Sequence, residues 1–207
     1  MFVLRDTTGG AMMVEVVCMS RTEVVLEARG SVSLPPPPPL HLVLVQGVGK
    51  GDRFEQVLQH GTEMGVSTFV PLISRRAVRR PAYNGRDGFL ERWQRILIGA
   101  TEQARREAVP HLCRPMSLPE AVESVREQDG RFVLHPDACT RLSPSDAPAD
   151  GRHVALFVGP EGGFDREELE FLEDHDILPR SIGPYVLRTE TAALAAVAVL
   201  LFGQPVS

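Results

Sequence analysis

The segment HVALFVGPEGGF, residues 153–164, decides the fold class because it joins an apolar strand to a glycine-rich turn. His153–Val158 predicts a buried strand, since a short apolar run bounded by turn residues is typical of a sheet interior. Asp165 and Glu168 form a capping box for the next helix, and Phe164 with Leu169 forms its hydrophobic staple. The glycine turn therefore follows the carboxyl end of a strand, where open α/β sheets bind ligands.

The chain after residue 40 repeats this strand–helix alternation. We expect further strands at residues 41–45, 68–73 and 131–135, and helices at 52–64, 89–107, 117–128 and 192–202. Such alternation predicts an α/β fold with a parallel, helix-covered sheet. Asp52 with Glu55 predicts a capping box, Gly65 a left-handed helix exit, and Pro71 a sheet edge or strand end. The last helix is apolar all round and is expected to be buried on most sides.

The first 33 residues show a different pattern. The segments Phe2–Leu4, Met12–Val17 and Thr22–Ala28 are rich in β-branched and apolar residues and predict two or three antiparallel strands. So few strands do not make an independent sheet. They must pack on the rest of the chain, pair with further strands or sit in an oligomer. Pro35–Pro39 predicts a stiff polyproline II spacer and marks a domain boundary.

The charge of the chain is unevenly distributed. The net charge is -5 over 207 residues, which argues against a nucleic-acid partner. Between Arg75 and Arg114, however, ten arginines face four acidic residues. Arg75, Arg76, Arg79 and Arg80 follow a predicted strand, so a loop would carry them. They form either a solvated face or an RNA-binding loop, for which the planar guanidinium is well suited.

Cysteine content and hydropathy argue against disulfide-rich, zinc-binding and membrane-spanning proteins. Cys18, Cys113 and Cys139 lack a CxxC spacing, which disfavours a disulfide framework and a structural zinc site. The longest apolar run, Ala192–Phe202, is shorter than the roughly 18–20 residues that span a bilayer. No signal segment is evident at the N-terminus. We therefore expect a soluble, cytoplasmic protein.

A second glycine-rich stretch, Gly47–Asp52, lies between a strand and a helix. A P-loop needs a glycine at Leu44 and a serine or threonine at Gly51, and a dinucleotide fingerprint needs a glycine at Asp52. Both templates fail. The stretch is better explained as a turn with one basic contact residue, Lys50.

A third polar segment, Ile182–Ala192, leads into the last helix. Arg188, Thr189, Glu190 and Thr191 are explained either by helix capping with an Arg–Glu pair or by a site. Their position next to the Gly159–Phe164 turn favours a site. Glu161 disfavours a phosphate ligand there, because its charge would repel the phosphate.

Together these motifs resemble the RsmE family of ribosomal RNA methyltransferases in the SPOUT superfamily. The resemblance covers about Leu40–Phe202. It rests on KGDR at 50–53, TEMGVS at 62–67, RW at 92–93, ATEQARREAVP at 100–110, GPEGGF at 159–164 and LRTETAALAA at 187–196. The order and spacing of these motifs are specific, whereas each motif alone is weak.

The resemblance implies a SPOUT-type domain with a C-terminal trefoil knot over residues 40–207, a linker at 35–39, and a PUA-like β domain at 1–34. Family members carry more residues before the segment matching Phe2–Leu4, so we expect the β domain to be incomplete. The implied activity is S-adenosylmethionine-dependent methylation of uridine N3 in small-subunit (16S) rRNA. The implied partners are this rRNA, or the assembled small subunit, and a second copy of the chain.

The expected site residues fall into three groups. Arg106 and Arg188 are candidate catalytic guanidiniums, and Glu102, one helical turn before Arg106, would orient it. The expected cofactor-binding residues are Leu134, Gly159, Pro160, Glu161, Gly162, Gly163, Ile182, Gly183, Val186, Leu187, Arg188, Thr189 and Ala192. The expected RNA-binding residues are Lys50, Arg75, Arg76, Arg79 and Arg80. No metal is expected, because a sulfonium methyl is already activated.

Three other readings compete with this one. The first is a SPOUT methyltransferase for another RNA or base atom, because target choice depends on surface shape. The second is a non-catalytic RNA-binding assembly factor of the same fold, which would need neither GPEGGF nor LRTETA. The third is a nucleotide-binding protein that uses the Lys50 loop, which the failed phosphate templates disfavour.

Overall fold

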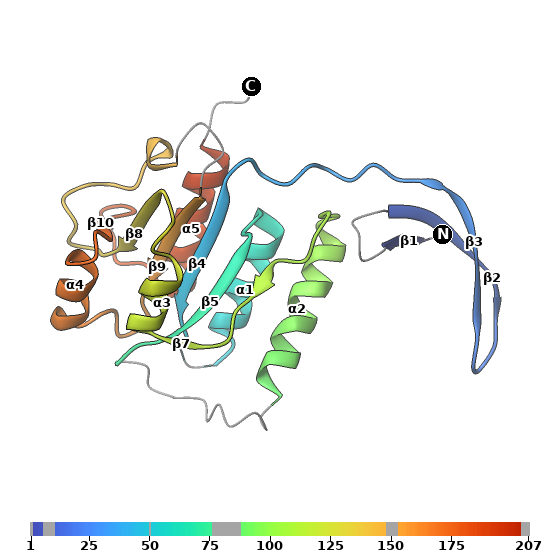
Figure 1. Cartoon of the computed structure of the whole chain (residues 1–207), viewed down its shortest axis with the longest axis horizontal. Coiled ribbons are helices and arrows are strands. Elements are labelled where there is room, and N and C mark those ends of the chain that lie inside the picture. Colours follow the sequence, from blue (N-terminus) through green and yellow to red (C-terminus); the bar gives the residue numbers. More distant parts are fainter. Residues whose placement is uncertain (1, 6–10, 50, 76–87, 148–152, 204–207) are drawn as a thin grey trace.

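The chain folds into two separate sheets. The computed structural model describes residues 2–5, 11–49, 51–75, 88–147 and 153–203. A three-stranded antiparallel sheet has the order β1-β2-β3, and a larger sheet has the order β10-β8-β9-β4-β5-β6, with β7 also paired to β5 (Figure 1). The strands are β1 Phe2–Arg5, β2 Ala11–Met19, β3 Val24–Ser31, β4 His41–Gly47, β5 Thr68–Ile73, β6 His111–Leu112, β7 Met116–Ser117, β8 Gly130–Leu134, β9 His153–Val158 and β10 Leu178–Arg180.

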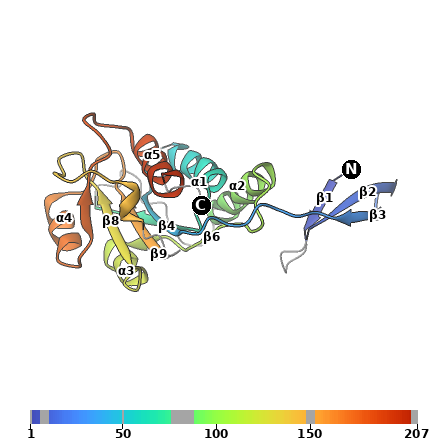
Figure 2. The same ribbon diagram turned by 90° about the horizontal axis from the view of Figure 1, so that it is seen from above.

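Every strand pair of the larger sheet is parallel, which confirms the predicted fold class. Its core has two layers because side chains alternate across the strands. In β4, Leu42 and Leu44 face one apolar cluster and Val43 and Val45 face the other. Helices α1 (Arg53–Met64), α2 (Phe89–Gln103) and α5 (Thr189–Phe202) cover the first face, and α3 (Leu118–Ser124) and α4 (Arg166–Glu173) the second (Figure 2).

The prediction that Pro71 marks a sheet edge or a strand end is wrong, because β5 continues to Ile73. Strand β5 lies inside the sheet, with β4 on one side and the short strands β6 and β7 on the other. Strand β6 pairs with Thr68 and Phe69, and β7 pairs with Leu72 and Ile73, so neither pairs with Pro71. The interruption between the two short strands lies where proline has no N–H to donate.

Helix ends follow local chemistry in most cases. The capping boxes at Ser117–Glu120 and Asp165–Glu168 are confirmed by hydrogen bonds, and Gly65 ends α1 with φ 111°. The predicted Asp52–Glu55 box is wrong, because Asp52 makes no side-chain capping bond. The Glu55 carboxylate instead binds Arg92 of α2, 2.5 Å away, so a tertiary contact replaces the local one.

Two helix boundaries differ from the predictions. Helix α2 ends at Gln103 rather than near Glu107, because Arg105 takes a left-handed conformation with φ 55°. Helix α5 begins at Thr189, three residues before the predicted start. Its buried face comprises Ala193, Ala196, Val197 and Leu200, while Phe202 is 62% exposed, so α5 is buried on one side rather than on most sides.

The three-stranded sheet stands apart from the α/β body in both views, joined to it by the extended segment before β4 (Figures 1 and 2). Large apolar side chains on it are solvent-exposed, including Val17 at 51% and Met19 at 77%. Packing of this sheet on the rest of the chain is therefore not observed among the described residues. Pairing with further strands or with another molecule stays a prediction.

Two further expectations concern the chain as a whole. Within the described ranges, no helix combines the length and apolar character needed to cross a bilayer. Cys18, Cys113 and Cys139 are all free thiols.

Candidate functional site

A cavity of about 550 Å³ opens at the carboxyl ends of β8, β9 and β10, beside the first turn of α5. Open α/β sheets bind their ligands at this edge, and the sequence predicts a ligand site here. The structure brings all of the expected cofactor-binding residues to this one cavity: Leu134, Gly159, Pro160, Glu161, Gly162, Gly163, Ile182, Gly183, Val186, Leu187, Arg188, Thr189 and Ala192. The turn after β9 and the loop before α5 therefore meet, as the sequence predicts.

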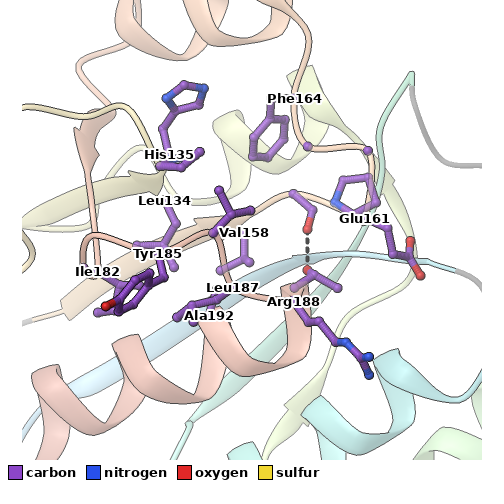
Figure 3. Close-up of a pocket in the computed structure, with 18 of the residues that line it drawn as sticks. Leu134, His135, Val158, Glu161, Phe164, Ile182, Tyr185, Leu187, Arg188 and Ala192 are labelled. Carbon is purple, nitrogen blue, oxygen red and sulfur yellow. Dashed lines mark hydrogen bonds between the residues drawn. The ribbon is translucent and has the colours of Figure 1, made fainter.

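One end of the cavity is mostly apolar, with Arg180 and His135 near Leu134, and the other end is charged. Ile182 and Tyr185 lie at one end, with Leu134 beside them, and Arg188 and Glu161 lie at the other (Figure 3). Tyr185 is 78% exposed and Val186 84%, so the apolar end opens to solvent. A ligand with an apolar ring and a charged tail matches this distribution.

A short hydrogen bond joins the two loops that form the cavity. The Thr189 hydroxyl donates to the Gly159 carbonyl oxygen at 2.5 Å, marked by the dashed line in Figure 3. The hydroxyl also accepts a hydrogen bond from buried Gln46 at the end of β4. Thr189, the first residue of α5, thus connects the start of this helix to the turn after β9 and to the end of β4.

The two glycine-rich stretches pack directly against each other. A Cβ atom on Gly47 would lie 2.3 Å from the backbone nitrogen of Pro160, and one on Gly49 would lie 2.3 Å from Glu161 Oε2. Arg53, the first residue of α1, forms an ion pair with Glu161 at 3.1 Å. Gly47 and Gly49 therefore support the Gly159–Phe164 turn, and the Glu161 carboxylate is held toward α1. Lys50 itself lies outside the described residues.

Arg106 and Glu102 do not line the cavity. Arg106 lies beyond the end of α2, so the expected helical pairing with Glu102 is wrong. The Arg106 guanidinium donates to the backbone carbonyl oxygens of Thr62 at 2.7 Å and Val66 at 3.0 Å, at the end of α1. Burial lowers the pKa of Arg106. Its contacts join two helix ends, and Glu102 is exposed.

Arg188 is the catalytic candidate that reaches the cavity. It is the N-cap residue of α5, it is exposed, and it makes no ion pair with any described residue. The expected alternative, an Arg188–Glu190 pair, is therefore not formed. One carboxylate oxygen of Glu190 is buried without a hydrogen-bond partner in the described part of the chain.

Of the expected RNA-binding arginines, the structure describes only Arg75. Its guanidinium binds Glu167 of α4, which raises the pKa of Arg75, and its backbone N–H donates to the buried Glu168 at 2.9 Å. The segment after β5 is thereby attached to the start of α4. Arg76, Arg79 and Arg80 lie outside the described residues, so their role stays a prediction.

Several residues of the cavity were not predicted as site residues. These are Arg53, His135, Pro136, Val158, Phe164, Arg180 and Tyr185. Signals existed for most of them: Val158 and Phe164 flank the glycine turn, Tyr185 lies inside the polar segment before α5, and Arg53 belongs to the KGDR motif. Gln46 had no local signal, because only the tertiary fold brings it to Thr189.

A parallel sheet with a cavity between a glycine turn and a helix start defines an α/β ligand-binding domain. A family model described as RNA methyltransferase domain matches residues 36–201, and the chain belongs to that family. The "Ribosomal RNA small subunit methyltransferase E" of Mycobacterium bovis is 35% identical over 175 residues, covering 81% of this chain and 66% of that protein. The chain spans 65%, 52% and 66% of the first three curated relatives, which carry the same name.

Solved structures agree with this assignment. A protein from Legionella pneumophila, described as a methyltransferase with bound SAM, has a TM-score of 0.86 and 32% identity, covering 95% of this chain and 80% of its own. A "Ribosomal RNA small subunit methyltransferase E" from Neisseria gonorrhoeae, bound to S-adenosyl methionine, has a TM-score of 0.84 and 29% identity with the same coverage.

Proposed function

We propose that this chain transfers a methyl group from S-adenosylmethionine to N3 of a uridine in small-subunit rRNA. One observation carries the proposal: the GPEGGF turn and the start of α5 form a single cavity, and the guanidinium of Arg188, which forms no ion pair with any described residue, lies at its charged end. The relatives named as small-subunit rRNA methyltransferases and the two neighbours with bound cofactor support it.

The cavity fits S-adenosylmethionine in size and chemistry. Its volume of about 550 Å³ falls within the range of roughly 300–1,000 Å³ typical of small-molecule sites. Leu134, Ile182 and Leu187 would hold the adenine ring, and the glycines leave main-chain groups accessible to the ribose. Glu161 at the other end suits the ammonium group of the methionine part of the ligand.

A residue of the chain would then stabilise the uracil base during methyl transfer. S-adenosylmethionine supplies a methyl group that is already activated by the sulfonium. Uracil N3 carries a hydrogen and becomes nucleophilic only when that proton passes to solvent, so negative charge develops on the ring. Methyl transfer to N3 then breaks the S–CH3 bond and leaves S-adenosylhomocysteine. A guanidinium held at that position stabilises this charge without reorganisation during the reaction. We assign this role to Arg188.

The remaining catalytic candidates receive a different assignment. Arg106 binds two carbonyl oxygens at the end of α1, and Glu102 lies outside the cavity. A guanidinium that is already occupied by two backbone acceptors is poorly placed to receive charge from a base. We therefore assign Arg106 and Glu102 to the architecture around the end of α2.

Three features of the whole protein belong to the same proposal. The C-terminal segment would thread as a trefoil knot, next to the contact that Ser181 makes with Thr140 and Leu142. The half-exposed apolar surface of α5 supports a homodimer, because such surfaces are usually covered. The separate sheet of residues 2–31 supports a PUA-like RNA-binding unit at 1–34, a linker at 35–39 and a methyltransferase domain at 40–207. A cytoplasmic location fits an enzyme that acts on ribosomal RNA.

Calorimetric titration of the purified chain with S-adenosylmethionine tests the cofactor site. Gly162 lines the cavity, so the long side chain of Gly162→Arg should obstruct it and abolish binding. Gly99→Arg is the matched control, because Gly99 is exposed on α2 and a Cβ atom there meets nothing within 4 Å. Equal affinity of the wild type and Gly162→Arg would exclude this cavity as the cofactor site.

A further inference from the structure

Gln46 occupies an unusual position at the end of β4. It is 1% exposed and does not line the cavity, yet its Nε2 donates to the Thr189 hydroxyl at 2.9 Å. Thr189 in turn donates to the Gly159 carbonyl oxygen at 2.5 Å. A single chain of hydrogen bonds therefore joins β4, α5 and the glycine turn, and two of its three members line the cavity.

The chain of bonds has a fixed direction. A hydroxyl has one proton, and that of Thr189 is directed to Gly159, so the neighbour of Thr189 must be a donor. The Gln46 amide supplies this donor. Its other polar atom, Oε1, is buried and has no partner among the described residues. An unsatisfied buried oxygen is costly, so the amide is retained at a cost in stability, which points to a role elsewhere.

The surrounding packing leaves little room for the turn to adjust. Gly47, next to Gln46, approaches the Gly159–Pro160 peptide so closely that a Cβ atom would lie 2.7 Å from the Gly159 carbonyl carbon. Within the turn itself, a Cβ atom on Gly159 would lie 3.1 Å from Gly163. The orientation of the Gly159 carbonyl thus depends on the end of β4.

We propose that Gln46 is a positioning residue for the cofactor site, an inference that rests on the proposed function. Its amide orients the Thr189 hydroxyl, which holds the Gly159 carbonyl and the first turn of α5 in the geometry that receives the cofactor. Gln46 itself does not touch the cofactor. Gln46→Glu keeps the shape but replaces the donor by an acceptor, so Thr189 turns its proton toward the carboxylate and releases Gly159.

The test compares cofactor affinity in variants that break the hydrogen-bond chain with variants that make the same chemical change elsewhere. S-adenosylmethionine is titrated calorimetrically at pH 8 into wild type, Gln46→Glu, Thr189→Val and the double variant. Gln128→Glu and Thr101→Val are matched controls, because Gln128 Oε1 and Thr101 Oγ1 are buried without partners in the described ranges and do not line the cavity. Thermal unfolding without ligand verifies that each variant folds.

We expect each single variant to raise Kd about tenfold, the equivalent of roughly 1.4 kcal/mol for one lost hydrogen-bond chain. The double variant should bind no more weakly than the weaker single variant, because both break the same chain. The controls should stay within about twofold of wild type, since they break no such bond. Unchanged Kd values in folded single variants, or independent additive losses in the double variant, would overturn the inference.

Two further measurements cover the cases in which Gln46→Glu does not fold or the wild type does not bind the cofactor. If Gln46→Glu does not fold, Thr189→Ser must preserve affinity where Thr189→Val loses it; equal affinities would refute the role of the hydroxyl. A wild-type chain that binds no S-adenosylmethionine would instead contradict the proposed function. The two failures are therefore distinguishable.

Discussion

The Arg53 guanidinium and the Glu161 carboxylate lie 3.1 Å apart and join the first residue of α1 to the glycine turn at the cavity. The side chains are 38% and 23% exposed. An ion pair of this exposure contributes little to stability, about 1 kcal/mol at most. It does restrict where the turn can lie, because the same carboxylate packs against Gly49.

Glu161→Gln should therefore change cofactor binding more than stability. The substitution keeps the side-chain shape but removes the ion pair and the charge that would face the ammonium group of the cofactor, and the turn gains freedom that the cofactor must then restrict. We expect a Kd for S-adenosylmethionine raised about three- to tenfold, with a change in the free energy of unfolding below about 1 kcal/mol. Calorimetric titration and urea unfolding measure the two quantities.

Glu170→Gln provides the control for this prediction. Glu170 forms an exposed ion pair with Arg166 within α4, away from the cavity. Its loss should leave the Kd unchanged. If Glu170→Gln and Glu161→Gln weaken binding equally, the effect comes from surface charge and not from the turn.

Arg188→Ala should separate binding from turnover. The guanidinium stabilises charge that develops only during methyl transfer, so the variant should keep a Kd within about threefold of wild type and lose about 10²–10³-fold in kcat. Single-turnover methylation of small-subunit rRNA, measured by nucleoside mass spectrometry, reports the rate. Loss of affinity with normal kcat would show that Arg188 binds the cofactor instead.

Arg106→Ala should act on stability. Its guanidinium satisfies the carbonyl oxygens of Thr62 and Val66, and charged hydrogen bonds of this kind contribute roughly 1.5–3 kcal/mol each. We expect a loss of about 2–4 kcal/mol in the free energy of unfolding, measured with urea. Arg95→Ala, exposed on α2, should change stability by less than about 0.5 kcal/mol. A fully stable Arg106→Ala chain with no turnover would restore Arg106 as a catalytic candidate.

Comparison of the sequence predictions with the structure shows which features are determined by residues close together in the sequence. The parallel sheet and the capping box at Asp165 were predictable, because periodicity and capping depend on residues within one turn of each other. So was the cavity, because strand ends of a parallel sheet share an edge. The end of α2 was not predictable: its four final expected residues have no helix breaker before Pro110, and the chain leaves the helix where Arg106 can reach the end of α1.

The role of Gln46 was hidden for a related reason. A polar residue near the end of an apolar strand has no local pattern that marks it, and its partner lies 143 residues away. The failed capping of α1 is similar, since Glu55 binds Arg92 of another helix instead of the backbone beside it. Long-range contacts of this kind override local propensity.

The cap of α3 predicts a pH dependence. Hydrogen bonds from Ser117 and the neighbouring Arg114 lower the pKa of Glu120 from 4.5 to about 2. Because the folded-state pKa is depressed, the stabilisation is fully present above the unfolded-state value and is lost as pH falls from about 4.5 towards 2. Glu120→Gln should therefore be less stable than wild type at pH 7. The difference should shrink across this pH window in urea unfolding series; a constant difference would show that the carboxylate charge is not involved.

The most direct test of the central claim is a methyl-transfer assay on small ribosomal subunits that lack the modification. The subunits are incubated with the chain and S-adenosylmethionine, and the rRNA nucleosides are analysed by mass spectrometry. The account predicts that 3-methyluridine forms with the wild type and the Gly99→Arg control but not with Gly162→Arg. Tight cofactor binding without 3-methyluridine, or methylation at another base atom, would contradict it.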